Sequence, residues 1–408
     1  MRKPLDSPFS PGADTIPDVW AGRTRQLSDW RDVLRPRRLA GLPERGRTIL
    51  GEAGSGKSSL VRRITADGER RGDLVTSQLR IPTGTDPIKR VAEALLQLAG
   101  QAGLPMKTEK RLTELIGRVE AVAVSGVSLA LRAGEGPEAY RSLTELLVEI
   151  GRAAMRNDVA VVLHLDEVQN MLDDKVLSQL LIALGDALAF TEPVEAPGGH
   201  VIDRALPIIV YLTGLPEFAD MAGARKGATF ARRFMRTFLE AIDDDALMEA
   251  LQPFVAEGWQ ILSDAGRPER VWMEPTAQRL IVDLSCGEPF LFQLAGERAW
   301  YAGTDNVITA DDVRRGWDDA ASEAESHVQR ILDRLPGRER EFIEAMAELP
   351  PDDRSLTNIA DAAGLQKVTD AGPTSQRLDV VRGIIARGRP YRFRHRAVEA
   401  MLTTSWPR

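Results

Sequence analysis

The chain has 408 residues, of which 43% are hydrophobic and 28% charged, and its formal net charge is −7. This length predicts two or three globular domains. One cysteine, Cys286, excludes a disulfide framework and a cysteine-rich zinc site, and four scattered histidines exclude a histidine metal cluster. Because the sequence shows neither a membrane-length apolar run nor a secretory leader, we expect a cytoplasmic protein without membrane contact.

The N-terminal half of the chain has the pattern of an α/β domain. The first 17 residues are rich in proline and lack apolar periodicity, which predicts a flexible tail. From 18 to 245, short apolar runs alternate with amphipathic helical stretches, as in a parallel sheet that is covered on both faces. Strands are expected near 48–50, 74–81, 159–165 and 208–212, a hairpin at 122–131 and a surface loop at 192–203.

The chain after residue 246 is predicted to be helical. Helical patterns without a strand signal indicate a helical domain over 246–337, in which Thr309 is an N-cap. Over 338–408 we expect three short helices followed by a hairpin with glycine and proline at its tip, which is the order of a winged helix-turn-helix. The predicted helices cover 246–262, 275–284, 290–301, 309–335, 339–349, 356–363 and 374–386.

One segment has the pattern of a phosphate-binding loop. Residues 51–58, Gly-Glu-Ala-Gly-Ser-Gly-Lys-Ser, match G-x-x-x-x-G-K-[ST] between a predicted strand and a predicted helix that begins with Ser59. Glycines in this pattern let backbone N–H groups surround a phosphate. The Lys side chain is expected to bridge β- and γ-phosphates, and the Ser58 hydroxyl to ligate Mg²⁺. A glycine-rich turn without function is the alternative interpretation. The expected contacts to the nucleotide come from Gly51, Gly54, Ser55, Gly56, Lys57, Ser58 and Ser59.

Two carboxylates follow a buried strand further along the chain. Asp166 and Glu167 end the apolar run 159–165, so they lie at the edge of the sheet where open α/β sheets bind ligands. Asp166 is expected to hold Mg²⁺ through water, and Glu167 to act as the general base on the attacking water. An acidic helix cap is the alternative interpretation. Together with the phosphate loop, these carboxylates predict an ATPase with ATP and Mg²⁺ as its ligands.

These motifs resemble the AAA+ and STAND branches of P-loop ATPases, in which the second nucleotide motif also ends in two acids. A GTPase is disfavoured because the sequence has no Asn-Lys-x-Asp motif. The resemblance implies a three-layer αβα core, a helical lid over 246–337 and a winged helix. It also places Gly22 and Arg23, in Trp-Ala-Gly-Arg, near the adenine, and Thr213, after the strand 208–212, near the γ-phosphate.

The resemblance carries two further expectations, which point to different mechanisms. Residues 230–236, Phe-Ala-Arg-Arg-Phe-Met-Arg, are similar to the arginine-finger segment, so Arg232 or Arg233 would reach a neighbouring subunit's nucleotide in an oligomer. An exposed basic helix is the alternative. The lid segment 286–290 lacks the sensor arginine and resembles the Gly-x-Pro of STAND proteins, in which Pro289 packs near the adenine and ATP or ADP sets a switch.

The C-terminal segment concentrates positive charge in an acidic protein. Between 377 and 396 there are seven arginines and one acid. Alternation over 391–396 predicts a strand whose aromatic residues face one side and whose arginines face phosphates on the other. A solvated edge strand is the alternative interpretation. Duplex DNA is then contacted by Arg392, Arg394 and Arg396 on the wing, and by Gln376 and Arg377 near the start of the helix 374–386.

Two functions follow from this pattern. The leading hypothesis is an AAA+/STAND-type ATPase that couples its nucleotide state to the remodelling of DNA or nucleoprotein, as a homo-oligomer or with a partner protein. The alternative is a nucleotide-dependent signalling switch that exposes a protein-binding surface, with the winged helix packed within its own chain. The sequence leaves open which of the two applies.

Overall fold

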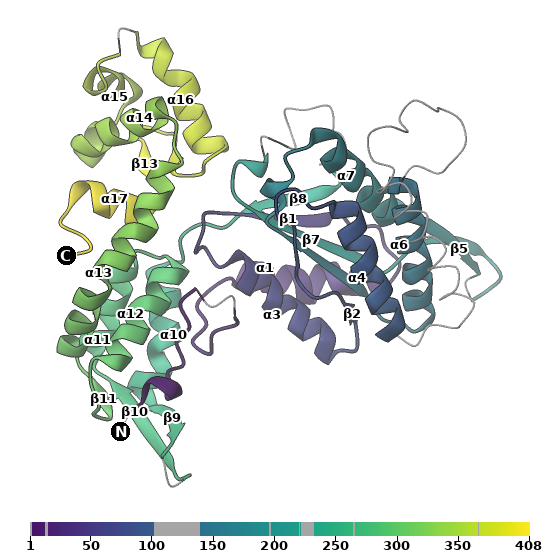
Figure 1. Ribbon diagram of the computed structural model, residues 1–408, viewed down its shortest axis with the longest axis horizontal. Helices are drawn as coiled ribbons and strands as arrows, with labels where there is room; N and C mark the ends of the chain where they lie inside the picture. The colour runs from purple at the N-terminus through teal and green to yellow at the C-terminus, as the bar shows by residue number, and fades with distance from the viewer. Residues whose placement is uncertain are drawn as a thin grey trace. The chain divides into compact units, whose positions relative to one another are not determined.

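The computed structural model describes residues 2–12, 15–101, 139–195, 197–219, 221, 232–263, 266–365 and 367–408. The chain forms two compact units (Figure 1). Unit 1 comprises residues 1–23, 51–59 and 238–408, and unit 2 comprises 24–50 and 60–237. The predicted phosphate loop thus groups with the C-terminal part of the chain. The predicted hairpin at 122–131 lies outside the described residues. Among the helices that are described, none is long and apolar enough to cross a membrane.

Unit 2 is built on a parallel sheet. The strand order is β2-β4-β7-β1-β8, and β3 also pairs with β4. Four pairs of neighbouring strands run parallel, so their carboxyl ends meet at one edge. These pairs are β2 with β4, β3 with β4, β4 with β7, and β7 with β1. The strands are β1 (Gly46–Leu50), β2 (Leu74–Val75), β3 (Leu79–Arg80), β4 (Val161–Asp166), β7 (Ile208–Gly214) and β8 (Phe234–Phe238).

Helices cover both faces of this sheet, as the alternation of side chains along β7 shows. A Cβ on Gly151 of α6 would come within 2.8 Å of Ile208, whereas Tyr211, on the opposite face, packs 6.5 Å from the ring of Trp30. Trp30 also donates to Asp67 of α3. The predicted three-layer αβα core is therefore confirmed. The helices are α1 (Thr24–Ser28), α2 (Arg35–Leu39), α3 (Lys57–Arg70), α4 (Pro87–Gln101), α6 (Ala139–Arg156) and α7 (Asp174–Ala189).

One prediction within unit 2 is wrong. The expected surface loop at 192–203 contains a hairpin, in which β5 (Thr191–Glu195) pairs antiparallel with β6 (Val201–Ala205). Gly198 and Gly199 have φ of +105° and +78° in its turn. Most of the hairpin's residues are exposed, so no apolar pattern marked its strands in the sequence.

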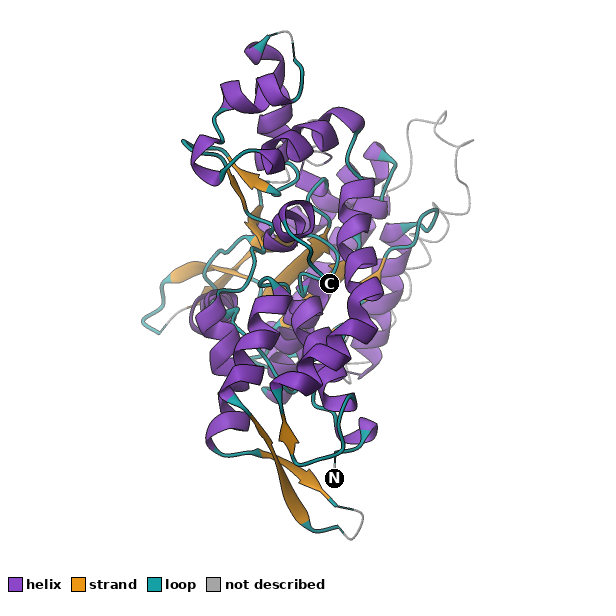
Figure 2. Ribbon diagram, turned by 90° about the vertical axis from the view of Figure 1, so that its left-hand side faces the viewer, coloured by secondary structure: helices purple, strands orange, loops and turns teal. Residues whose placement is uncertain are grey.

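Unit 1 contains the predicted lid helices. Thr309 is the N-cap of α13, and its hydroxyl accepts from Asp312 in a capping box. The expectation that this part lacks strands is wrong, because β9, β10 and β11 form a small sheet (Figure 2). Glutamate, arginine and proline in β10 concealed the strand pattern. The elements are α10 (Asp244–Ala256), β9 (Trp259–Leu262), β10 (Pro268–Met273), α11 (Pro275–Ser285), α12 (Pro289–Tyr301), β11 (Val307–Ile308) and α13 (Ala310–Asp333).

The C-terminal elements follow the predicted order of three helices and a hairpin, and a further helix ends the chain. The third helix, α16, covers Val368–Val380 and not 374–386, since Ala371 and Leu378 anchor it in the core despite Pro373. The winged-helix assignment stays a prediction. The elements are α14 (Gly337–Glu348), α15 (Leu356–Ala362), α16, β12 (Ile385–Ala386), β13 (Arg392–Phe393) and α17 (Arg396–Thr403).

The N-terminal segment is packed, so the prediction of a flexible tail is wrong for residues 2–12. Phe9 is 2% exposed and its ring stacks 5.7 Å from that of Phe254. Arg2 is buried and its guanidinium donates to Asp312 at 2.9 Å. Apolar periodicity could not reveal this segment, because it is anchored by single side chains that fit sites formed by residues 254–312.

Truncation of Phe9 should therefore destabilise unit 1. We expect Phe9→Ala to lower the free energy of unfolding by roughly 3–5 kcal/mol, because it removes a buried ring and leaves a cavity. Leu5→Ala is the matched control, since Leu5 is 95% exposed on the same segment. Urea titration measures both variants. Equal stability of Phe9→Ala and the parent would contradict the packing described for this segment.

Candidate nucleotide site

The loop between β1 and α3 has the backbone conformation of a phosphate-binding loop. Gly54 and Gly56 have φ of +81° and +80°, a region that residues with side chains rarely adopt. At Gly51 a Cβ would come within 2.6 Å of Ser55 Oγ. Three glycines are thus required by the loop geometry and by close packing, as the motif predicted.

The predicted lysine lies on this loop. Lys57 is the first residue of α3, and its Nζ donates to the carbonyl oxygens of Gly51 at 2.9 Å and Glu52 at 2.8 Å. Ser58 and Ser59 follow in the first turn of the helix. The ammonium and the N-terminus of a 14-residue helix therefore both add positive potential next to the loop.

Lid residues of unit 1 pack directly against the phosphate loop. The N–H of Phe290 donates to the carbonyl oxygen of Gly54 at 3.2 Å. The ring of Pro289, the first residue of α12, lies 3.6 Å from where a Cβ on Gly56 would be. The structure thus brings Pro289 to the loop, while its predicted contact with the adenine stays a prediction.

Arg23 joins the same group of residues. Its guanidinium donates to the carbonyl oxygens of Ser55 at 2.9 Å and Glu240 at 2.8 Å. Burial lowers the pKa of Arg23 to about 10, although the carboxylates of Glu288 and Glu240 act in the opposite direction. Both Arg23 and Gly22 have positive φ, +63° and +60°. The Trp-Ala-Gly-Arg motif therefore supports the loop backbone.

Unit 2 holds the predicted Mg²⁺ ligand Asp166 at the carboxyl edge of its sheet. Asp166, 4% exposed, ends β4. Its Oδ1 accepts from the Thr213 hydroxyl at 2.5 Å and from the N–H of Glu167 at 2.9 Å, and its Oδ2 accepts from Gln78 Nε2 at 2.5 Å. These bonds hold the carboxylate in one orientation. Thr213 thus lies beside Asp166, and its predicted contact with the γ-phosphate or the attacking water stays a prediction.

His164 belongs to this network and was missed in the sequence. Its Nε2 lies 2.9 Å from Thr213 Oγ1. Because the hydroxyl donates to Asp166, it accepts from His164, which assigns the ring proton to Nε2. Burial lowers the pKa of His164 to about 4, opposed by the charge of Asp166. Its position two residues before Asp166 on the same face of β4 was the signal available in the sequence.

Glu167, the predicted general base, is exposed directly after β4. Its φ of +58° is unusual for a residue with a side chain. Its Oε2 accepts from Asn170 Nδ2 at 3.2 Å, and that amide also donates to the carbonyl of Ile81. The strained backbone turns the chain sharply at the sheet edge, and the carboxylate stays open to water. This environment suits a base that must reach a water molecule.

The predicted arginine-finger residues have different surroundings. Residues 222–231 lie outside the described part, while Arg232 and Arg233 directly precede β8. Arg232 is exposed, and Arg233 forms an ion pair with Asp186 of the same unit at 2.5 Å. Arg232 is therefore better placed than Arg233 to act on another subunit. Whether either does so stays a prediction.

The predicted DNA-reading residues on α16 are not where the sequence suggested. Because α16 begins at Val368, Gln376 and Arg377 lie in its C-terminal half and not near its N-terminus. The Arg377 guanidinium donates to Glu339 at 2.9 Å, and Arg382 donates to the other oxygen of the same buried carboxylate. The predicted base contact by Arg377 would require this ion pair to break.

The predicted row of wing arginines does not form either. The strand β13 ends at Phe393, and Arg396 is the first residue of α17. Arg394 pairs with Asp379 at 2.7 Å, and Arg396 pairs with Asp244 of α10 at 2.6 Å. Only the exposed Arg392 keeps the predicted strand position. The alternation of aromatic and basic residues continued beyond the strand, which misled the prediction.

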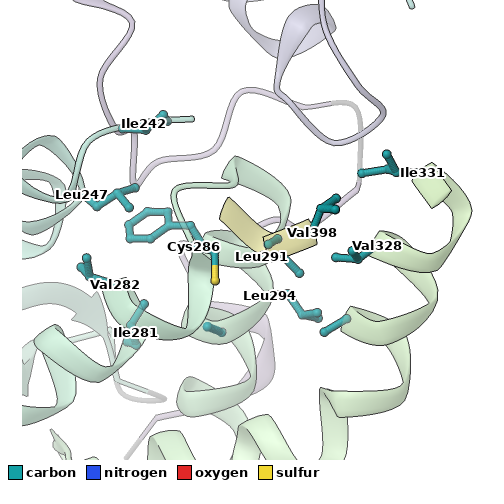
Figure 3. Close-up of a cluster of buried hydrophobic side chains, with 14 of the residues drawn as sticks. Ile242, Leu247, Ile281, Val282, Cys286, Leu291, Leu294, Val328, Ile331 and Val398 are labelled. Atoms are coloured by element: carbon teal, nitrogen blue, oxygen red, sulfur yellow. The ribbon is translucent and has the colours of Figure 1, made fainter. Parts of the chain in front are cut away.

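The helix α17 joins the C-terminal elements to the lid. Val398 lies in one hydrophobic cluster with Leu291 of α12 and Val328 of α13 (Figure 3). The preceding His395 lies 3.3 Å from the carboxylate of Glu288, the residue before Pro289. In unit 1, therefore, α17 contacts the lid segment that in turn packs on the phosphate loop.

Comparisons with known proteins agree with this fold. Residues 19–194 match the family model of the AAA ATPase domain. No curated protein matches the chain significantly. Among the described residues no group of three His, Cys, Asp or Glu side chains is arranged to hold a metal ion by itself. The roles of Ser58 and Asp166 as Mg²⁺ ligands stay a prediction.

Two solved structures share the P-loop NTPase fold over nearly the whole chain. The ORC2 protein of Aeropyrum pernix, in ADPNP–ADP complexes, has a TM-score of 0.55 at 16% identity, covering 98% of this chain and 95% of that one. A Walker-type ATPase of Pyrococcus abyssi has a TM-score of 0.53 at 15% identity, covering 94% and 96%. At these identities the similarity concerns the fold alone.

The buried neutral His164 should make stability depend on pH. Its folded pKa of about 4 lies below the ordinary 6.5, so the unfolded chain binds the additional proton between these values. The free energy of unfolding should therefore fall as pH decreases from 6.5 towards 4, by up to about 1.4 kcal/mol per pH unit from this residue. Urea unfolding from pH 7 to 4.5 measures the slope.

We expect His164→Gln, which keeps an N–H donor, to reduce this slope. His327 has a similarly lowered pKa and contributes in the same direction, so the comparison is between slopes and not absolute stabilities. His200→Gln is the control, because His200 is exposed on the hairpin. An unchanged slope in His164→Gln would show that this histidine is not buried in its neutral form.

Proposed function

We propose that the chain binds ATP with Mg²⁺ at the loop 51–58 and hydrolyses it to ADP and phosphate. The observation that carries this proposal is the conformation of the loop. Gly54 and Gly56 have positive φ, and the Lys57 ammonium donates hydrogen bonds to carbonyl oxygens of the loop. The match to the AAA ATPase domain over 19–194 supports it. The structures with the same fold include one with ADPNP and ADP.

Each group has a chemical role in this proposal. Lys57 spans the β- and γ-phosphates, and the N–H groups of the loop bind the phosphate oxygens. Mg²⁺ supplies positive charge to those oxygens when bound, and Ser58 and Asp166 would hold it. Glu167 accepts a proton from the attacking water, and Thr213 holds Asp166 in place.

Oligomers are a further part of the proposal. An arginine that reaches the γ-phosphate of a neighbouring subunit would stabilise the charge that develops during hydrolysis. Arg232 is the better candidate because it is exposed, whereas Arg233 is paired with Asp186. In a mixture of Lys57→Ala and Arg232→Ala chains that co-assemble, each would supply the group that the other lacks.

The proposed output of hydrolysis is the remodelling of DNA or nucleoprotein. The exposed Arg392 at the hairpin supports a DNA contact. A protein-directed switch is the second candidate. The ion pairs of Arg396 with Asp244 and of Arg382 with Glu339 favour it, because they use the basic side chains within unit 1.

Glu167→Gln should separate binding from hydrolysis. The variant keeps the shape of the side chain but loses the base, so ATP should bind with an affinity close to that of the parent and turnover should fall by roughly 10²-fold or more. Lys57→Ala should instead lose ATP binding. Calorimetry with ATP and a phosphate-release assay measure both properties.

The control for this pair is Glu195→Gln, an exposed carboxylate on β5. It should change neither binding nor turnover. If Glu167→Gln hydrolyses ATP at the parental rate, Glu167 is not the general base. If Lys57→Ala binds ATP with the parental affinity, the loop is not the nucleotide site.

A salt titration of DNA binding separates the two outputs. If the hairpin contacts phosphates, Arg392→Ala should reduce the slope of log affinity against log salt by about 0.9, because one fewer counterion is released. Arg396→Ala should change the slope less, since this guanidinium is paired with Asp244. Fluorescence anisotropy with the full chain, ATP and duplex DNA gives the slopes. If no DNA binds at low salt, the switch is the favoured function.

A further inference from the structure

A lid histidine is pressed against the phosphate loop. His327 of α13 is 5% exposed. A Cβ on Gly54 would come within 2.5 Å of His327 Cε1 and 3.1 Å of its Nε2. The ring also packs 4.5 Å from that of Phe290, whose own N–H donates to the carbonyl of Gly54. The imidazole thus reaches the loop at the residue that must be glycine.

The Nε2 atom of this ring is buried without a hydrogen-bond partner in the part of the chain that the structure describes. Leaving a buried polar atom unpaired costs stability, and native structures contain few such atoms. A leucine would fill the space beside Phe290 without that cost. The histidine therefore needs an explanation other than packing, and a ligand on the loop provides one.

The residue that directly follows α13 holds the helix on the same loop. Arg334, the C-cap of α13, keeps helical backbone angles and follows His327 by seven positions, which places both on one face of the helix. The Arg334 guanidinium pairs with the carboxylate of Glu52, the second residue of the loop, and Glu52 is 5% exposed. Because the pair is partly buried, it fixes where α13 meets the loop, and with it the position of the His327 ring.

We propose that His327 contacts the nucleotide, donating Nε2–H to a phosphate oxygen of ADP or ATP on the loop 51–58, and that the pair Arg334–Glu52 positions it. This inference rests on the proposed function, since it requires that the loop binds nucleotide. It adds a lid contact from α13 to the one predicted from Pro289 on α12. A neutral imidazole suits the role, and burial does lower the pKa of His327 to about 4.

Two substitutions of His327 separate a ligand contact from a packing role. His327→Leu places an apolar side chain of similar size beside Phe290 and removes the hydrogen-bond donor. His327→Gln retains an N–H donor. We expect ADP and ATP affinities of the Leu variant to fall by about tenfold or more, as for loss of a hydrogen bond to a charged group. Its melting temperature without nucleotide should be equal to or higher than that of the parent. The Gln variant should bind close to the parent.

Calorimetry with ADP and with ATP on the full chain, together with thermal unfolding without nucleotide, gives these values. Gln329→Leu is the matched control on α13, because Gln329 bonds only to Asp333 of its own helix in the described contacts, and it should bind like the parent. The inference is overturned if His327→Leu binds nucleotide with the parental affinity. It is also overturned if His327→Gln binds nucleotide as weakly as His327→Leu does. If His327→Leu does not fold, His327→Met decides in its place.

The failure of this inference differs from the failure of the proposed function. If the parent binds neither ADP nor ATP, both are wrong. If the parent binds, Lys57→Ala does not, and His327→Leu binds like the parent, the loop is the nucleotide site and only the role of His327 is wrong.

Discussion

The absence of a side chain at Gly54 is the constraint on which the rest of unit 1 depends. Its φ of +81° turns the loop backbone, and its missing Cβ leaves room for His327 at 2.5 Å and Phe290 at 2.9 Å. Any larger residue would push both lid helices away from the loop. One glycine therefore allows the loop to take the conformation for phosphate and allows α12 and α13 to pack on it.

Buried ion pairs explain how an acidic protein carries an arginine-rich C-terminal segment. The carboxylate of Glu339 is 3% exposed and accepts from both Arg377 and Arg382. Removing either arginine would leave buried negative charge without full compensation, which is costly. The same segment is thus needed for the internal packing of unit 1, and only arginines outside such pairs, such as Arg392, are available to a ligand without loss of stability.

Contacts within unit 1 connect the C-terminal elements to the phosphate loop. Asp244 pairs with Arg396 at the start of α17, while His395 lies beside Glu288 and α12 begins at Pro289 next to Gly56. A change at the loop would reach α17 through two residues of the lid. This short path gives the proposed nucleotide state a physical route to the C-terminal elements, whichever ligand they bind.

The sequence by itself determined the α/β class, the phosphate loop and the carboxylates Asp166 and Glu167, because these features depend on local patterns of glycine, apolar runs and turn residues. The tertiary structure decided which residues that are distant in sequence contact one another, because local patterns do not contain this information. It buried Phe9, ended β13 at Phe393 and paired Arg396 with Asp244, a residue 152 positions away. It also brought His164 to Thr213 and His327 to Gly54. Local periodicity cannot reveal these contacts, because each partner lies on an element that is distant in sequence and its position depends on how the whole unit packs.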